Sequence, residues 1–215
     1  MERKDTYRHK GMRKKLAEEV HAQGIKDERI LEAIEKIPRH FFLDEAFLEM
    51  AYKNQAFPIG RGQTISQPYT VAFQTELLEV QKGDKILEIG TGSGYQACVL
   101  AELGARVYSI ERHKALSAKA KKLIASFGYK VRCIYGDGFL GYPALAPYDK
   151  IIITAAAPEI PQKLIEQLKI GGIMVIPKNE DDQQIMLKIT KQKDGSLKTK
   201  RLSYFKFVPM LKGKS

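Results

Sequence analysis

A glycine-rich stretch from Ile86 to Tyr95 carries the clearest chemical signal in the sequence. Apolar residues lead into glycines at alternate positions, and the segment from Tyr95 to Leu103 then has the pattern of a helix. Such a turn places backbone N–H groups and a helix N-terminus beside a bound ligand. A tight turn without a ligand is the alternative, but three glycines after a sheet strand favour a ligand site.

The spacing of these glycines indicates which ligand is bound. Gly90, Gly92 and Gly94 follow a GxGxG pattern, whereas nicotinamide and flavin enzymes use GxGxxG. Glu88 stands two residues before the first glycine, where its carboxylate would repel a pyrophosphate but can help to hold the cationic methionine part of S-adenosylmethionine. We therefore expect S-adenosylmethionine to bind at Glu88, Gly90, Thr91 and Gly92.

Two further acidic residues follow predicted strands. Glu111 comes 111 − 90 = 21 residues after the first glycine, where a carboxylate can accept hydrogen bonds from both ribose hydroxyls. Asp137 lies between Gly136 and Gly138, which let the backbone approach a flat ring while the carboxylate accepts from an adenine amino group. A solvated charge and an ordinary turn are the alternatives. Three such strand ends in succession predict a nucleoside pocket.

Several other kinds of site are absent from the sequence. Ser93 has Thr91 and Tyr95, rather than glycines, two residues on either side, so it is not the GxSxG nucleophile elbow of a hydrolase. No phosphate-binding P-loop occurs. The segment from Thr154 to Pro158 lacks the Asn/Asp-Pro-Pro-aromatic motif of adenine methylation. We expect no metal site, because the four histidines, His9, His21, His40 and His113, are scattered along the sequence. We interpret the two cysteines, Cys98 and Cys133, as small core residues.

The strands and helices that carry these residues are predicted to begin after Lys82. Short runs rich in Ile and Val alternate with amphipathic segments, as a parallel sheet covered on both faces requires. The runs are Lys85 to Ile89, Arg106 to Ile110, Val131 to Tyr135, Lys150 to Thr154 and Ile173 to Ile176. They predict an α/β fold with a doubly wound, mostly parallel, Rossmann-like sheet. Strands at Gln183 to Thr190 and Lys198 to Pro209, joined by a hairpin turn, should end it antiparallel.

The part before the sheet reads as a helical N-terminal extension followed by a loop. Apolar residues at helical spacing run from Tyr7 to about Phe47, with Asp27 capping the second helix and Pro38 ending it. Closely spaced glycines and prolines predict a loop without regular structure over 55–68, before a helix from Tyr69 to Val80. We expect a single domain: a helical lead-in (1–54), a substrate loop (55–68), a cofactor-binding core (82–178) and C-terminal strands (183–210).

Composition and charge limit the class of protein. The 215 residues are 44% hydrophobic and 28% charged, as in ordinary globular proteins, and the net charge of +11 should attract anions. The densest basic run, Met1 to Lys15, is not followed by an apolar segment, so we interpret it as no secretory signal. The longest apolar run, Ile151 to Ala157, is too short to span a membrane. We expect a cytoplasmic protein.

Five segments together resemble protein-L-isoaspartate O-methyltransferase, over about Ile37 to Met210. The first and last of them are the most specific to that family. They are Gly62 to Tyr69, Leu87 to Ala97, Val107 to Arg112, Gly136 to Gly138 and Thr154 to Pro161. The resemblance implies methyl transfer from S-adenosylmethionine to the free α-carboxylate of L-isoaspartyl residues in damaged proteins and peptides, which initiates repair through a succinimide.

The resemblance also implies residue roles. Ser66 matches the family's active-site serine, and we assign its hydroxyl to positioning the substrate carboxylate rather than to attack. Thr64 and Val208 would also contact the substrate. The remaining cofactor-binding residues implied are Thr64, Ile65, Gln67, Arg112, Asp137 and Gly138. A monomer that binds neither nucleic acid nor membrane is the expectation.

Alternatives remain open at this point. Ser66 before Gln67 and Pro68 is a good helix N-cap, and Val208 could belong to an edge strand. An RNA methyltransferase and a non-catalytic basic binding protein are the rival functions. Departures from the family pattern bear on the choice of peptide rather than on the reaction: Asn54 replaces a usual aspartate, Tyr142 a tryptophan, Lys206 an arginine and Met210 a leucine.

Overall fold

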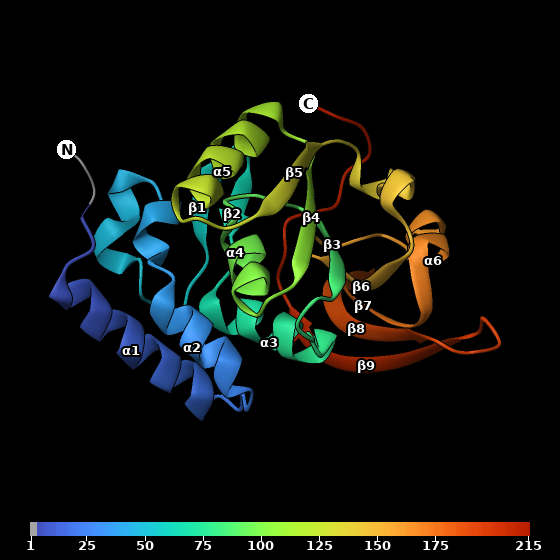
Figure 1. The fold of residues 1–215 in the computed structure, drawn as a ribbon, viewed down its shortest axis with the longest axis horizontal. Helices are drawn as coiled ribbons and strands as arrows, with labels where there is room; N and C mark the ends of the chain where they lie inside the picture. Colours follow the sequence, from blue (N-terminus) through green and yellow to red (C-terminus); the bar gives the residue numbers. More distant parts are fainter. Residues whose placement is uncertain (1–3) are drawn as a thin grey trace.

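The computed structural model describes residues 4–215, so Arg3 of the basic N-terminal run lies outside the described residues. Within that range seven strands form one sheet in the order β5-β4-β3-β6-β7-β8-β9 (Figure 1). Five strands are parallel, and β8 and β9 pair antiparallel at one edge. The strands are β3 (Lys85–Ile89), β4 (Arg106–Glu111), β5 (Val131–Tyr135), β6 (Tyr148–Ile153), β7 (Leu168–Glu180), β8 (Gln183–Lys191) and β9 (Leu197–Phe205). The predicted fold class is confirmed.

Helices cover both faces of the sheet. On one face lie α3 (Pro68–Leu78), α4 (Tyr95–Glu102) and α5 (Lys114–Ser126), and on the other lies α6 (Gln162–Gln167) (Figure 1). Short 3-10 helices follow β5, namely η3 (Gly138–Leu140) and η4 (Pro143–Leu145). The near-continuous apolar strands reflect this burial on both sides.

The helical lead-in packs against the α3 and α4 side. It comprises α1 (Tyr7–Ala22), α2 (Glu28–Lys36), η1 (Arg39–Phe42) and η2 (Glu45–Met50). Asp27 accepts a hydrogen bond from the backbone N–H of Arg29 and caps α2, as predicted. Buried residues of α1 and α2 belong to the same apolar cluster as those of α3, α4 and the sheet. The lead-in and the sheet therefore share one apolar core, and the division of the chain into a single domain stays a prediction.

The prediction that residues 55–68 lack regular structure is wrong. β1 (Phe57–Gly60) and β2 (Gln63–Ile65) form an antiparallel hairpin in which Phe57 pairs with Ile65, and both side chains are buried. Gly60, Arg61 and Gly62 all have positive φ, so the glycines that suggested a loop make the tight turn instead. The ribbon has only two strands, so Pro58 can occupy one without interrupting a wider sheet.

The C-terminal segment differs from the expected long strand. β9 ends at Phe205 rather than Pro209, and the following residues cross the carboxyl ends of β6 and β4. The backbone of Ser215 bonds with Arg112 and Lys114 beside the start of α5 (Figure 1). The chain therefore passes over the sheet edge where parallel α/β proteins bind ligands. No helix among the described residues is long and apolar enough to cross a membrane.

Candidate active site

A cavity lies at the carboxyl ends of β3, β4 and β6. β3 pairs with β4 on one side and with β6 on the other, so this is the switch point of the doubly wound sheet. A second cavity shares Gly90 and Glu111 with the first, and a third shares Thr64 and Ser66 with it.

The glycine turn forms the floor of this cavity. Gly90 has a φ of 100°, and a Cβ added there would lie 2.5 Å from Oγ1 of Thr154. That hydroxyl donates to the carbonyl oxygen of Gly90 at 2.8 Å and so joins the ends of β3 and β6. The close approach and the positive φ both require glycine here. Gly90, Thr91 and Gly92 all line the cavity, as expected of cofactor-binding residues.

Glu111 stands where the first two cavities meet. Its carboxylate accepts hydrogen bonds from the backbone N–H groups of Gly92 and His113, each at 2.9 Å, and the residue is 5% exposed. A carboxylate has about four acceptor positions, so two remain for hydroxyl groups of a ligand. The structure thus orients Glu111 toward the ligand space at the end of β4.

Glu88 is placed differently from the other predicted cofactor residues. It is fully buried beneath the turn and does not line the cavities. The Ser109 hydroxyl donates to its carboxylate, and Ser109 also bonds with Thr91 on the cavity wall. Burial, with a smaller contribution from Glu111, raises the pKa of Glu88 to about 8. Its direct contact with a cofactor stays a prediction.

The second cavity is mostly apolar and has the predicted acidic turn at one side. Ile110 and Met210 line it with Gly138 and Arg112. Both carboxylate oxygens of Asp137 accept backbone N–H groups, from Phe139 at 2.9 Å and from Gly213 at 2.8 Å, and Asp137 does not line the cavity. The Asp137 contact with adenine also stays a prediction.

Ser66 lies between the first and third cavities, which Thr64 and Val208 also line. Ile65 lines the first cavity and Gln67 the third. The N-cap of α3 is Gln67, so the alternative in which Ser66 caps this helix is wrong. Within residues 4–215 the Ser66 hydroxyl makes no hydrogen bond, which leaves it available to a ligand.

Val208 is not part of β9. Its carbonyl oxygen accepts the N–H of Ala156 at 2.8 Å, and the N–H of Met210 donates to the Ala156 carbonyl at 2.8 Å. The edge-strand alternative is therefore wrong, because the backbone here pairs with the segment that follows β6. This pairing places Val208 at the cavity that the glycine turn also lines.

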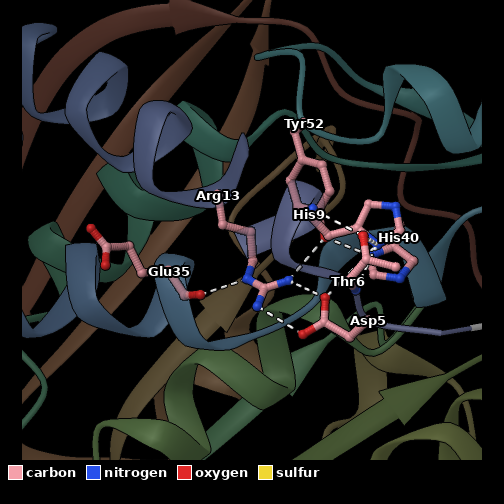
Figure 2. Close-up of polar contacts among 7 residues, drawn as sticks. All are labelled: Asp5, Thr6, His9, Arg13, Glu35, His40 and Tyr52. Carbon is pink, nitrogen blue, oxygen red and sulfur yellow. Dashed lines mark hydrogen bonds and ion pairs between the residues drawn. The ribbon is translucent and has the colours of Figure 1, made fainter. Parts of the chain in front are cut away.

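The interpretation of all four histidines as scattered is wrong for two of them. Figure 2 shows the rings of His9 and His40, which stack with centroids 4.0 Å apart near Asp5. The Asp5 oxygens accept from the Arg13 guanidinium at 2.7 and 2.9 Å, and Nδ1 of His40 bonds with the Tyr52 hydroxyl at 2.5 Å. A guanidinium in contact with the carboxylate opposes a cation, so these contacts favour a polar network over a metal site.

Sequence reasoning gave no role to several residues that line the cavities. Thr154 and Ala155 lie in the family segment after β6, and that segment was the signal that could have identified them. Tyr95 and Gln96 face the cavity from the first turn of α4, which the glycine motif could have indicated. Further lining residues include Gln63, Thr70, Val71, Lys206, Pro209 and Leu211.

Comparisons with known proteins agree on one family. The family model for protein-L-isoaspartate(D-aspartate) O-methyltransferase matches residues 11–215. The protein-L-isoaspartate O-methyltransferase of Cytophaga hutchinsonii is 54% identical over 96% of this chain and 94% of its own. That of Christiangramia forsetii is 53% identical over 99% of this chain and 100% of its own.

Two solved structures are similar to the chain. A protein-L-isoaspartate O-methyltransferase is 30% identical with a TM-score of 0.84, covering 92% of this chain and 65% of that one. A Plasmodium falciparum structure, described as a putative protein-L-isoaspartate O-methyltransferase in complex with S-adenosyl-L-homocysteine, is 25% identical with a TM-score of 0.82. Its match covers 94% of this chain and 99% of that chain.

Proposed function

The chain belongs to the protein-L-isoaspartate(D-aspartate) O-methyltransferase family, and from this premise we propose how its own residues carry out that reaction. The enzyme transfers a methyl group from S-adenosylmethionine to the free α-carboxylate of L-isoaspartyl residues in damaged proteins and peptides. The resulting ester closes to a succinimide, whose hydrolysis returns part of the material to normal aspartate. The observation that carries the assignment is the family match over nearly the whole chain.

The residues around the two adjoining cavities fit S-adenosylmethionine. Glu111 offers acceptors for ribose hydroxyls, and the apolar side chains of Ile110 and Met210 suit a flat ring. Backbone of the glycine turn lines the space between them. Arg112 and Gly138 would contact the adenine side, and Thr64, Ile65 and Gln67 the methionine and substrate side. When bound, the cofactor supplies an electrophilic methyl group on a positively charged sulfur.

We assign Ser66 to orienting the substrate. A carboxylate is already ionised at neutral pH, so the site needs no strong base. The Ser66 hydroxyl can donate to one carboxylate oxygen and fix the direction of the other, while Thr64 and Val208 border the same space. The segment from Val208 to Met210 pairs with Ala156 and lines the first two cavities, so it would limit the access of water to the reacting groups.

We propose a cytoplasmic monomer whose partners are isoaspartyl proteins and peptides rather than nucleic acid or membranes. Both cysteines are unpaired and Cys98 is buried, as expected in a reducing compartment. The net charge of +11 gives at most weak steering of anionic substrates, because salt screens exposed charges.

One assay tests the function directly. The protein is incubated with methyl-labelled cofactor and a matched pair of peptides, one containing isoaspartate and the other aspartate at the same position. We expect base-labile methyl ester on the isoaspartyl peptide only, because the cavity must distinguish the extra backbone methylene and the free α-carboxylate.

The same assay separates the rival functions. Equal labelling of both peptides, or none, would contradict the proposal. Label transferred to RNA, with binding that weakens steeply as salt rises, would favour an RNA methyltransferase. Cofactor binding without turnover on any isoaspartyl peptide would favour a non-catalytic binding protein.

A further inference from the structure

Arg39 is a fully buried arginine in the lead-in, outside the cavities just described. It is the first residue of η1, directly after Pro38. Its Nε donates to the carbonyl oxygen of Ala51 at 3.1 Å, just after η2. The guanidinium therefore extends from one part of the lead-in toward the base of the β1–β2 hairpin.

The same guanidinium bonds to both ends of that hairpin. A single nitrogen, Nη2, donates to the carbonyl oxygens of Gln55 at 3.2 Å and of Ser66 at 2.9 Å. Gln55 precedes β1 and Ser66 follows β2, so one side chain holds the two ends of the segment together. Arg39 thus contacts Ser66 through its backbone carbonyl only. The Ser66 hydroxyl makes no hydrogen bond with the guanidinium and is available to a ligand in the cavities.

The environment of Arg39 is unusual for a buried cation. Within the described part of the chain no carboxylate lies within ion-pair distance, and the guanidinium carbon lies 5.0 Å from the ring centroid of Tyr95, a cavity residue. Burial lowers the pKa of Arg39 to about 10, so the side chain still carries its charge at neutral pH. A desolvated charge bonded to carbonyl groups costs free energy that an apolar residue would avoid.

We propose that Arg39 is a positioning residue for the methyl transfer, which fixes the Ser66 backbone, and with it the hydroxyl, relative to the glycine turn. This inference rests on the proposed function. The planar guanidinium presents donors in a fixed fork that reaches Ala51, Gln55 and Ser66 at once, and a lysine ammonium on a flexible stem cannot reproduce that geometry. Errors of about 1 Å in positioning reacting groups cost on the order of 100-fold in rate.

The experiment compares Arg39→Lys with Arg13→Lys. Arg13 is also buried, at 4% exposed, and contacts Asp5, Tyr52 and the Glu35 carbonyl, but no residue of the hairpin (Figure 2). Each variant is titrated with S-adenosylhomocysteine to count competent sites, and kcat per site and KM are then measured with the isoaspartyl peptide. Backbone hydrogen exchange is followed over residues 55–66.

We expect Arg39→Lys to lower kcat per competent site by 10-fold or more, while the Kd for S-adenosylhomocysteine changes less than 3-fold. Exchange over residues 55–66 should rise. Arg13→Lys should keep kcat per site within 2-fold and leave exchange in that segment unchanged. A purely structural role would lower the number of competent sites in Arg39→Lys without lowering kcat per site.

Other outcomes overturn the proposal. Equal kcat per site in the two variants, or unchanged exchange over residues 55–66, would contradict the proposal.

If Arg39→Lys does not fold, Arg39→Gln, which removes the buried charge, is measured instead. Failure of both variants to bind S-adenosylhomocysteine would assign Arg39 to stability. A wild-type protein inactive on the isoaspartyl peptide would contradict the proposed function, whereas an active wild type with an equally active Arg39→Lys would contradict only this inference.

Discussion

At the scale of single residues, the Ser66 hydroxyl is the group whose removal should change chemistry most selectively. It lies between two cavities and makes no hydrogen bond within residues 4–215, so its loss leaves no buried partner unpaired. A hydrogen bond to a charged group contributes about 1.5–3 kcal/mol. We expect Ser66→Ala to lower kcat about 10-fold to 100-fold, measured with the isoaspartyl peptide, with little change in cofactor affinity.

Ser126→Ala is the matched control, because Ser126 is exposed and its hydroxyl contacts only the Leu123 carbonyl of α5. Its kcat should equal that of the wild type. A Ser66→Ala protein with full turnover, or one that loses cofactor affinity in proportion to kcat, would remove Ser66 from substrate positioning. A large drop in melting temperature would instead indicate a structural role.

The site residues that the sequence predicts are those that belong to a local motif. Gly90, Gly92 and Glu111 follow strands at fixed spacing, so the sequence located them and the structure places them at one cavity. Arg39 gave no signal, because its contacts with Gln55 and Ser66 depend on the folded hairpin. Ser66 itself needed the family resemblance, since local rules favoured a helix cap that the structure does not contain.

At the level of elements, one predicted helix cap is confirmed and another is wrong, since Asp27 caps α2 but Ser66 does not cap α3. Asp27 accepts the Arg29 N–H at 3.1 Å and begins α2. The sequence did not predict the β1–β2 hairpin, because the closely spaced glycines of its turn, Gly60 and Gly62, favour a loop. Short two-stranded ribbons lack the long alternating pattern that identifies strands in wider sheets.

The Asp27 cap supports a prediction about α2. Removing a side-chain cap costs about 1 kcal/mol, so Asp27→Ala should lower the free energy of unfolding by about that amount in urea denaturation. The activity of the folded protein should not change, because Asp27 lines none of the three cavities.

Asp44→Ala provides the comparison for this prediction. Asp44 begins η2 without a side-chain capping bond, and its contact with Lys119 is an exposed ion pair. Such pairs contribute little, so we expect a change of less than about 0.5 kcal/mol. Equal losses in both variants would show that the cap itself contributes nothing measurable.

At the scale of the whole molecule, the sheet order explains why distant segments meet at one site. β3 lies between β4 and β6, and the C-terminal segment returns across their carboxyl ends (Figure 1). The alternation of strands and helices predicted a doubly wound sheet, but the return of Val208 to Ala156 is a contact between segments about fifty residues apart. Periodicity carries no information about such pairings.

The burial of Glu88 at the centre of the sheet makes a prediction about the stability of the whole protein. Burial raises its pKa in the folded state to about 8, from an ordinary value of 4.5. Between these values the folded protein keeps a proton that the unfolded chain releases, so stability falls as pH rises. The contribution is fully present below about pH 4.5 and is lost as pH rises through 8. A single proton accounts for a slope of at most about 1.4 kcal/mol per pH unit.

We therefore expect the melting temperature of the cofactor-free protein to fall between about pH 5 and pH 8, and to fall less in Glu88→Gln. The amide keeps a similar shape and can accept from Ser109, but it cannot ionise. Glu159→Gln, at an exposed carboxylate, should retain the wild-type slope. A Glu88→Gln slope equal to that of the wild type would mean that Glu88 is ionised in the folded state at neutral pH. In that case the carboxylate beneath the glycine turn would carry a charge even before a cationic ligand arrives.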